Sequence, residues 1–159
     1  MAKDYRPAIV HFGIKNQENR IAGMPPNNLC WQYVPFLKCN VMRNFRELII
    51  WKQGIQLTAN VYELCKQLPK DETYGLKSQI TRAAVSIPAN IAEGCSRRSE
   101  KDFRRFLEIS IGSAFELETH LVIAEKLGYI DRKSVDEFLR ELTVEQKQIN
   151  ALIIELTVD

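Results

Sequence analysis

Hydrophobic residues recur every three or four positions from residue 44 to the end of the chain, the spacing expected of helices that bury one face. Glycine, proline and capping residues interrupt this pattern and predict helices over residues 44–67, 76–94, 100–127 and 135–156. The connections between the helices are short, so neighbouring helices must run antiparallel. The pattern therefore predicts an all-α, antiparallel up-down-up-down four-helix bundle.

Each predicted helix carries one apolar stripe that is expected to face the core. In the first helix the stripe consists of Phe45, Leu48, Trp51, Ile55, Thr58, Tyr62 and Cys65. In the second it consists of Leu76, Ile80, Ala83, Ala84, Ile87 and Ile91. In the third it consists of Phe103, Phe106, Leu107, Ser110, Ala114, Leu117 and Leu121. In the fourth it consists of Val135, Phe138, Leu142, Ile149, Leu152, Ile153 and Leu156.

The second and third helices each carry a further apolar stripe on another face. A helix that packs on one core needs only one apolar face, so these stripes predict a contact with another subunit. The first stripe is small and the second bulky, and such unlike surfaces favour a head-to-tail contact that closes into a ring. The alternative, that both stripes fill one core, stays open here. The predicted interface consists of Val85, Ala89, Ala92, Ile111, Phe115 and Val122.

Four local features refine this prediction. Pro88 lies inside the second helix, where it removes a backbone hydrogen bond, so we expect a bend near residues 84–88 and a hydrogen bond from Ser86 to a freed carbonyl. Gly54 is expected to permit close approach of a neighbouring element. Capping sequences beginning at Ser99 and Ser134 are expected to start the third and fourth helices.

Residues 1–41 differ from the rest of the chain, because proline and glycine punctuate them and no helical period is sustained. We predict a poorly ordered N-terminal extension, followed by the bundle over residues 42–159. Two alternatives stay open. In the first, residues 1–41 result from a start codon placed upstream of the natural one. In the second, they pack on the bundle through Trp31, Tyr33 and Phe36.

Charge adds one local feature to this picture. The 159 residues carry a net charge of only +2, divided into +3 for residues 1–41 and −1 for the remainder. Around the turn after the second helix, however, five basic residues oppose only Glu100 and Asp102, and Arg82 extends this patch if its face of the helix points the same way. The basic residues of the turn are Arg97, Arg98, Lys101, Arg104 and Arg105.

This basic patch predicts binding of nucleic-acid phosphates, because guanidinium groups and the free amides of a helix N-terminus both donate to phosphate oxygens. Aromatic residues do not alternate with the basic ones, so base-specific reading is not supported. A solvated helix start, or salt bridges that hold subunits together, remain the alternatives.

The sequence offers little for catalysis or metal binding. The four cysteines form no C-x-x-C pair, and the two histidines do not supply the paired E-x-x-H motifs of a di-iron bundle. Glu116 and His120 are four residues apart and are interpreted as a helical side-chain pair. Neither a nucleophile elbow nor a phosphate loop is present. We therefore expect no enzyme, no catalytic residue, no metal and no cofactor.

No hydrophobic run approaches the roughly 20 residues that span a bilayer. The N-terminus has no apolar segment typical of a signal peptide. Cys65 lies in an apolar helical pattern and Cys95 lies where a helix ends, and buried or incidental thiols in a reducing compartment fit the cysteines better than a disulfide framework. These features predict a cytoplasmic protein without a membrane segment.

A family resemblance is carried by several separated motifs in order. They are RAAVSIPANIAEG with the following RRS (residues 82–99), MRNFRELIIWKQG (42–54), FRRFLEISIGSAFELETHL (103–121) and GYI (128–130). In these motifs the chain resembles the four-helix-bundle proteins encoded within intervening sequences of bacterial 23S ribosomal RNA genes. The resemblance runs from residue 42 nearly to the end and includes no part of residues 1–41.

The resemblance implies a homo-oligomer, and specifically a pentamer. The family is also similar to accessory proteins of diversity-generating retroelements, which are basic pentamers that bind nucleic acid and a reverse transcriptase. The expected function is therefore a non-enzymatic oligomeric scaffold that binds RNA or other nucleic acid. The alternative is a protein–protein adaptor, such as a reverse-transcriptase accessory subunit, that uses its basic residues in salt bridges.

Overall fold

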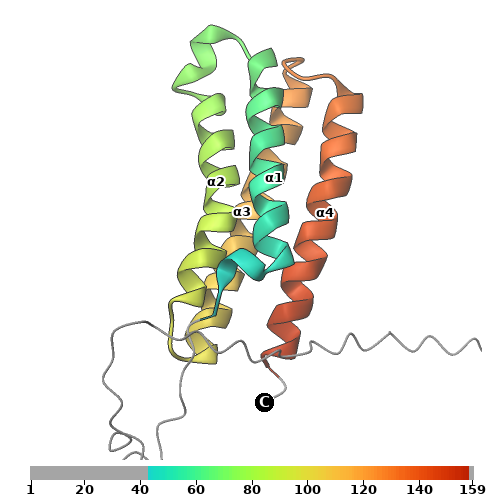
Figure 1. The fold of residues 1–159 in the computed structure, drawn as a ribbon. Helices are drawn as coiled ribbons and strands as arrows, with labels where there is room; N and C mark the ends of the chain where they lie inside the picture. Colours follow the sequence, from blue (N-terminus) through green and yellow to red (C-terminus); the bar gives the residue numbers. More distant parts are fainter. Residues whose placement is uncertain (1–42, 158–159) are drawn as a thin grey trace, which may run out of the picture. The chain divides into compact units, whose positions relative to one another are not determined.

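The computed structural model describes residues 43–157, and the regular structure in this part of the chain is helical throughout. Four α-helices alternate in direction, as Figure 1 shows, so the predicted all-α up-down-up-down bundle is confirmed. The predicted extension, residues 1–41, lies outside the described residues. The helices are α1 (Ile49–Leu64), α2 (Leu76–Cys95), α3 (Glu100–Lys126) and α4 (Arg132–Glu155).

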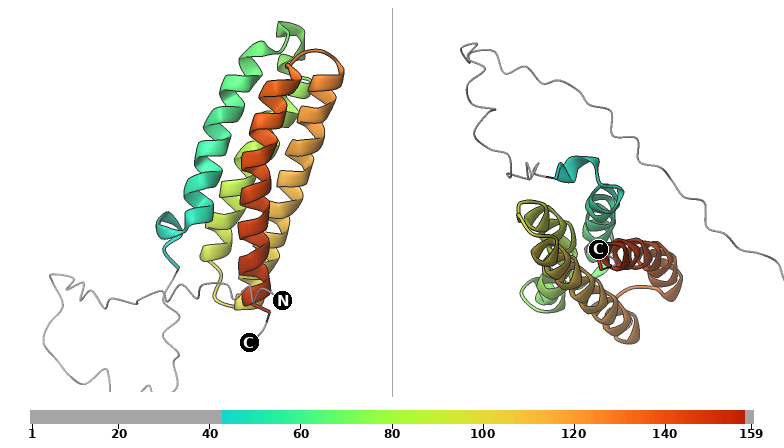
Figure 2. Two further views of the ribbon diagram at one scale, coloured as in Figure 1. Left: turned by 90° about the vertical axis from the view of Figure 1, so that its right-hand side faces the viewer. Right: turned by 90° about the horizontal axis from the view of Figure 1, so that it is seen from below.

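Each helix packs on two neighbours in the cyclic order α1, α2, α3, α4, which the view along the bundle in Figure 2 shows. The α2–α3 pair packs most extensively, and the α1–α4 pair packs least. Buried side chains from all four helices form one core. The α2–α3 turn lies at one end of the bundle, and the other two connections lie at the opposite end (Figure 1).

The first helix is shorter than the sequence predicted. Phe45–Glu47 forms a separate 3-10 turn, capped by the Asn44 side chain, which accepts a hydrogen bond from the amide of Arg46. Leu48 then adopts an extended conformation with ψ of 127°, so α1 begins only at Ile49. A second 3-10 turn, Cys65–Gln67, follows α1.

The predicted core face of α1 was wrong at Ile55 and Tyr62, whereas Cys65 is buried and Phe45, Leu48 and Trp51 pack against the core. Ile55 and Tyr62 are 46% and 51% exposed. The buried residues are instead Ile50, Gly54, Leu57 and Val61. Apolar residues occupy a wide arc of this helix, so their spacing does not select one core face within that arc. The contact between α1 and α2 selects it.

That contact is built around Pro88 of α2. A Cβ at Gly54 would lie 3.3 Å from the Cβ of Pro88, so the expected close approach is confirmed. Because Pro88 has no N–H, the carbonyl of Ala84 has no partner within its own helix. The Thr58 hydroxyl of α1 lies 3.0 Å from that carbonyl and 2.7 Å from the Gly54 carbonyl of its own helix, so it is shared between the two acceptors. The expected role of Ser86 was therefore wrong; the bend near residues 84–88 stays a prediction.

The second, third and fourth helices follow the predicted core faces closely. On α2, Ile80, Ala83, Ala84, Ile87 and Ile91 are buried. The Ser99 hydroxyl accepts from the amide of Asp102 at the start of α3, as the capping sequence predicted.

The α3–α4 connection corrects the predicted cap of the fourth helix. Gly128 follows α3 with φ of +73°, a conformation that favours glycine. The cap of α4 is Asp131 rather than Ser134, so α4 begins at Arg132, three residues before the predicted start at residue 135. The Asp131 carboxylate accepts from both the amide and the hydroxyl of Ser134, at 2.9 and 2.6 Å, and these hydrogen bonds lower its pKa.

Candidate nucleic-acid site and subunit interface

The basic residues are positioned by a tight turn between α2 and α3. Only four residues separate Cys95, which ends α2, from Glu100, which begins α3. A Cβ at Gly94 would lie 2.8 Å from the Cβ of Phe106, so glycine permits this close approach of the two helices. The turn therefore places Arg97 and Arg98 beside the first turns of α3.

Arg97 is held in place from two sides. Its guanidinium carbon lies 4.5 Å from the centre of the Phe106 ring, and the guanidinium group forms an ion pair with Glu93 one turn earlier on α2. The stacking orients the planar group, whereas the ion pair offsets part of its charge. Arg97 is consequently a preoriented donor with reduced net positive charge.

A surface hollow of ≈ 430 Å³ opens beside this stacked pair and is lined by Arg97, Asp102, Arg105, Phe106 and Ile109. Arg105 and Lys101 are exposed, as is Arg98 in the turn itself. The sequence assigned Phe106 to the core, but it is only partly buried and lies among the basic residues. The hollow therefore combines guanidinium groups with one aromatic ring.

The other two basic residues of the predicted patch lie apart from the hollow. Arg82 approaches Glu116 of α3 at 3.9 Å. Glu116 is 11 residues beyond Arg105 on the same face of α3, so Arg82 lies on the same side of the bundle but roughly 16 Å away. Arg104 turns toward the end of α4, where it bonds the Thr157 hydroxyl at 3.4 Å and approaches Glu108 at 3.6 Å.

The predicted subunit-interface residues remain uncovered or only partly covered in the single chain. Val85 and Phe115 are 43% and 55% exposed. Ala89 is exposed, and Ala92, Ile111 and Val122 are partly buried. Val85 and Phe115 therefore do not fill the core of the single chain, as the alternative reading of the two stripes required.

The α2 stripe is wider than the sequence indicated, because α1 contributes to it. Ile55 and Tyr62 are three residues before and four residues after Thr58, which bonds α2, so they border the α1–α2 seam. Val85 and Ala92 flank Pro88 in the same way. We define the α1–α2 apolar face as Ile55, Tyr62, Val85, Ala89 and Ala92.

The α3 apolar stripe, defined as Ile111, Phe115 and Val122, lies on a different side of the bundle. Glu118 of α3 accepts a hydrogen bond from Gln146 of α4 at 3.0 Å, so it marks the side of α3 that faces α4. The three stripe residues are seven residues before, three before and four after Glu118, which places them beside it on the helix. The stripe therefore borders the α3–α4 seam. In the cyclic order of the helices, this seam and the α1–α2 seam lie on opposite sides (Figure 2).

Potential metal and redox groups are dispersed. Between residues 43 and 157, no group of three or more His, Cys, Asp or Glu side chains could hold a metal ion. His120 Nε2 lies 3.6 Å from Glu116, as the pairing predicted, and its Nδ1 atom is buried without a partner in the described part of the chain. Cys65 and Cys95 are buried thiols, and burial raises the pKa of both.

Sequence reasoning missed two features. Ile55 and Tyr62 were assigned to the core because α1 is apolar on several sides. Glu145 is absent from the predicted apolar stripe of the fourth helix, yet it is 1% exposed. The uninterrupted spacing of 142, 145 and 149 was the available signal for its burial.

The class of protein is thus a four-helix bundle with two opposed apolar surfaces and a basic turn at one end. The family model described as "23S rRNA-intervening sequence protein" matches residues 46–151, and the chain belongs to this family. The curated proteins provide no match.

A solved structure supports the same assignment. It is a protein of unknown function from the S23 ribosomal protein family of Bacteroides thetaiotaomicron, with 25% sequence identity and a TM-score of 0.62. The likeness covers 66% of this chain and 98% of that one. Among the helices of residues 43–157, none is long and apolar enough to cross a membrane.

Proposed function

We propose that this protein is a non-catalytic scaffold that assembles into a closed homo-oligomeric ring and binds RNA or other nucleic acid through its basic turn. The observation that carries the proposal is the pair of exposed apolar surfaces on opposite sides of one bundle. Surfaces of this kind mark interaction sites in proteins that are otherwise polar outside. No catalytic residue and no cofactor enter the proposal, which places the protein in the cytoplasm.

The opposed surfaces favour a ring over a two-fold dimer. The α1–α2 apolar face is broad and mixes aromatic with small side chains, whereas the α3 apolar stripe presents Phe115. Unlike surfaces on opposite sides pair head to tail, and such contacts close into a ring when the rotation permits it. Burial of one phenylalanine contributes roughly 1.5–3 kcal/mol. The expected number of subunits, five, follows from the family resemblance alone.

Ring symmetry would repeat the α2–α3 turn at the same end of every subunit. Arg97, Lys101 and Arg105 then form a basic annulus, and the free amides at the N-terminus of α3 add to its affinity for phosphate. The stacked arrangement of Arg97 on Phe106 also offers a flat surface to an unpaired base. These features support binding to the backbone of a nucleic acid without strong sequence preference.

One observation favours the second candidate function, a protein–protein adaptor such as a reverse-transcriptase accessory subunit. Arg82, Arg97 and Arg104 all have acidic neighbours within the chain, in Glu116, Glu93 and Glu108 respectively. Such pairs reduce the charge available for phosphate. An adaptor would use the same turn for salt bridges with a protein partner.

Two measurements on the purified full chain test the proposal. Light scattering should give one closed oligomer at micromolar concentration, and a monomer there would overturn the ring. The ratio of absorbance at 260 to that at 280 nm should be high after purification at low salt and should fall as salt rises, because phosphate contacts are weakened by added counterions. An oligomer without affinity for RNA at any salt concentration would leave the adaptor as the better description.

A further inference from the structure

Several hydrogen-bond acceptors are buried without donors in the bundle. Both carboxyl oxygens of Glu145 on α4 lack a partner within residues 43–157, although this residue is 1% exposed. The side-chain oxygens of Gln53 on α1 and Gln148 on α4 are buried and unpartnered in the same way. An unsatisfied buried acceptor is costly, so a donor that reaches these atoms is expected.

These acceptors belong to one seam. The Glu141 carboxylate accepts from Asn60 Nδ2 of α1 at 3.1 Å, which sets the register of α4 on α1. Glu145 and Gln148 lie one and two turns beyond Glu141 on the same face of α4. Gln53 lies two turns before Asn60 on the antiparallel α1, and therefore at the level of Gln148. All the unpartnered oxygens consequently lie along the α1–α4 seam.

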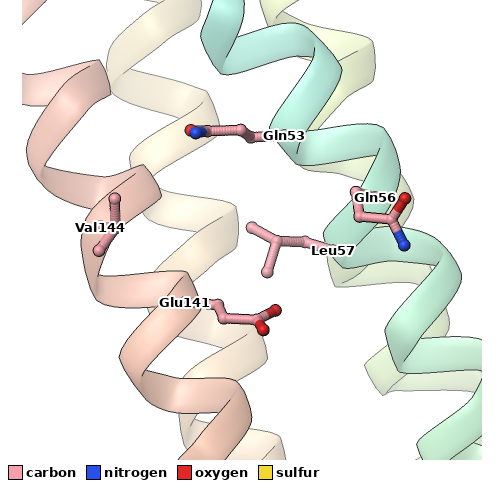
Figure 3. A pocket seen from close by; sticks show the side chains of 5 residues that line it. All are labelled: Gln53, Gln56, Leu57, Glu141 and Val144. Atoms are coloured by element: carbon pink, nitrogen blue, oxygen red, sulfur yellow. The ribbon is translucent and has the colours of Figure 1, made fainter.

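A groove opens at this seam, where the two helices pack least extensively. It has a volume of ≈ 300 Å³ and is lined by Gln53, Gln56, Leu57, Glu141 and Val144. Figure 3 shows Gln53 extending from α1 toward α4, while Leu57 and Glu141 extend into the space between the helices. Its volume is at the lower end of the range for small-molecule sites, about 300–1,000 Å³. Glu145 follows Val144 directly in the chain, but it is buried and does not itself line the groove.

We propose that the α1–α4 seam binds a short aliphatic diamine. One ammonium group pairs with Glu145 and the side-chain oxygens of Gln53 and Gln148, and the second pairs with Glu141. The methylene chain lies against apolar lining. An ammonium group has three donors and no acceptor, which matches the unpartnered side-chain oxygens of Gln53 and Gln148 and the carboxylate that Glu145 forms when it loses its proton. The two carboxylates are four residues apart on α4, roughly 6 Å along the axis, a spacing that a four-carbon diamine can bridge.

Electrostatics at the seam couples binding to proton release. Burial alone raises the pKa of Glu145 to about 8. The facing side chains of α1 are amides, Glu118 of α3 is engaged by Gln146, and no charged group of α1, α2 or α3 in the described residues shifts this pKa. Glu145 is therefore a neutral acid at pH 7. The incoming ammonium displaces one proton, leaving a carboxylate–ammonium pair and a proton in solution.

Calorimetry of the full chain with 1,4-diaminobutane tests this inference. Titrations at pH 7 in two buffers with different ionisation enthalpies should report the release of close to one proton. Affinity should rise by up to about tenfold per pH unit between pH 6 and 7.5, because the released proton is linked to binding. Butylamine, which has a single ammonium group, should bind at least about tenfold more weakly.

Three variants make the test specific. Glu145→Gln is isosteric with the protonated acid and keeps the neutral charge, so it should fold, lose the proton release and bind at least about tenfold more weakly. Gln53→Leu should weaken binding while proton release persists. Glu137→Gln, an exposed site on the same helix, should change neither property.

Absence of binding at millimolar diamine would overturn the inference. Proton release that survives Glu145→Gln would also overturn it, since the diamine would then associate with surface carboxylates. Both results are independent of the proposed ring and its nucleic-acid site.

Discussion

Glu145 shows what a single acidic residue does in an apolar core. Burial raises its pKa from the ordinary value of 4.5 to about 8, so the folded chain holds a proton that the unfolded chain releases near pH 4.5. The stability that this proton provides is complete below pH 4.5 and is lost as pH rises toward 8. The free energy of unfolding should therefore fall by up to about 1.4 kcal/mol per pH unit between these limits.

Urea unfolding of the wild-type chain and of Glu145→Gln at pH 6 and pH 8 measures this contribution. The wild-type protein should lose more stability than the variant over this interval, because glutamine does not titrate. Equal pH dependence in the two proteins would show that Glu145 is solvated or paired in solution.

Arg97 and Arg98 carry the prediction for nucleic acid. Replacement of both by alanine should weaken RNA binding and should lower the salt dependence by about one counterion per lost phosphate contact. Their exposed turn predicts little change in stability, although Arg97 loses its contact with Phe106. Fluorescence anisotropy at several salt concentrations measures both effects.

Arg132→Ala with Lys133→Ala provides the matched control, because these residues lie at the start of α4, at the opposite end of the bundle (Figure 1). This control should retain the affinity of the wild-type chain. Unchanged affinity of the Arg97 and Arg98 variant at low and moderate salt would reject the turn as a phosphate site.

At the residue scale, the sequence predicts whatever depends on near neighbours. Ser99 was recognised as a cap because its partner, Asp102, is three residues away. Asp131 and Ser134 are both residue types that cap helices, and the Asp131 carboxylate is the cap of α4, which spacing alone does not decide. The stacking of Arg97 on Phe106 depends on the path of the turn, so it could not be predicted.

Among the helices, the α1–α2 contact makes the clearest energetic prediction. Thr58→Val removes the hydroxyl that satisfies the Ala84 carbonyl beside Pro88, and the variant should be less stable by about 1–3 kcal/mol. In a Pro88→Ala background the helix supplies its own N–H to that carbonyl. The cost of Thr58→Val should then be smaller, which a double-mutant cycle by urea unfolding measures.

Thr143→Val serves as the control for this cycle. Thr143 is exposed on α4 and bonds only the Leu139 carbonyl of its own helix, at 2.7 Å. Its replacement should change stability by less than about 0.5 kcal/mol. If Thr58→Val costs the same in both backgrounds, the hydroxyl is not compensating for the proline.

Element by element, prediction succeeded where apolar and polar residues separate cleanly. The core faces of α2 and α3 could be assigned because polar residues fill the space between their apolar stripes. The face of α1 could not, since Ile55 and Leu57 point in different directions and only Thr58 and Gly54, through α2, decide which is buried. A long-range contact thus determined what local spacing left open.

Assembly supplies the prediction for the whole molecule. Phe115→Asp on α3 and Tyr62→Asp on α1 both place a charge on an apolar surface of the single chain, where each parent side chain is more than half exposed, at 55% and 51%. Each variant should remain helical by circular dichroism and give a smaller mass by light scattering, because the charge is buried only in the oligomer.

The two variants also show which part of the proposed interface is wrong if assembly does not behave as expected. Loss of helicity in Phe115→Asp would assign that residue to the core of its own bundle. If Tyr62→Asp keeps the wild-type mass while Phe115→Asp dissociates, α1 does not take part in the interface. The surface on the second helix is then the narrower one that the sequence predicted.

The sequence revealed two apolar stripes but could not show that they lie on opposite sides, because that depends on how four helices close into a cycle. Phe115 and Tyr62 variants therefore damage different halves of one contact. When the two are mixed, the intact face of each should dock on the intact face of the other, giving a one-to-one pair that cannot grow further. Either variant, when expressed together with the wild-type protein, should likewise block further growth of the oligomer, because it offers only one intact face. A substoichiometric amount of the variant should therefore be enough to inhibit assembly.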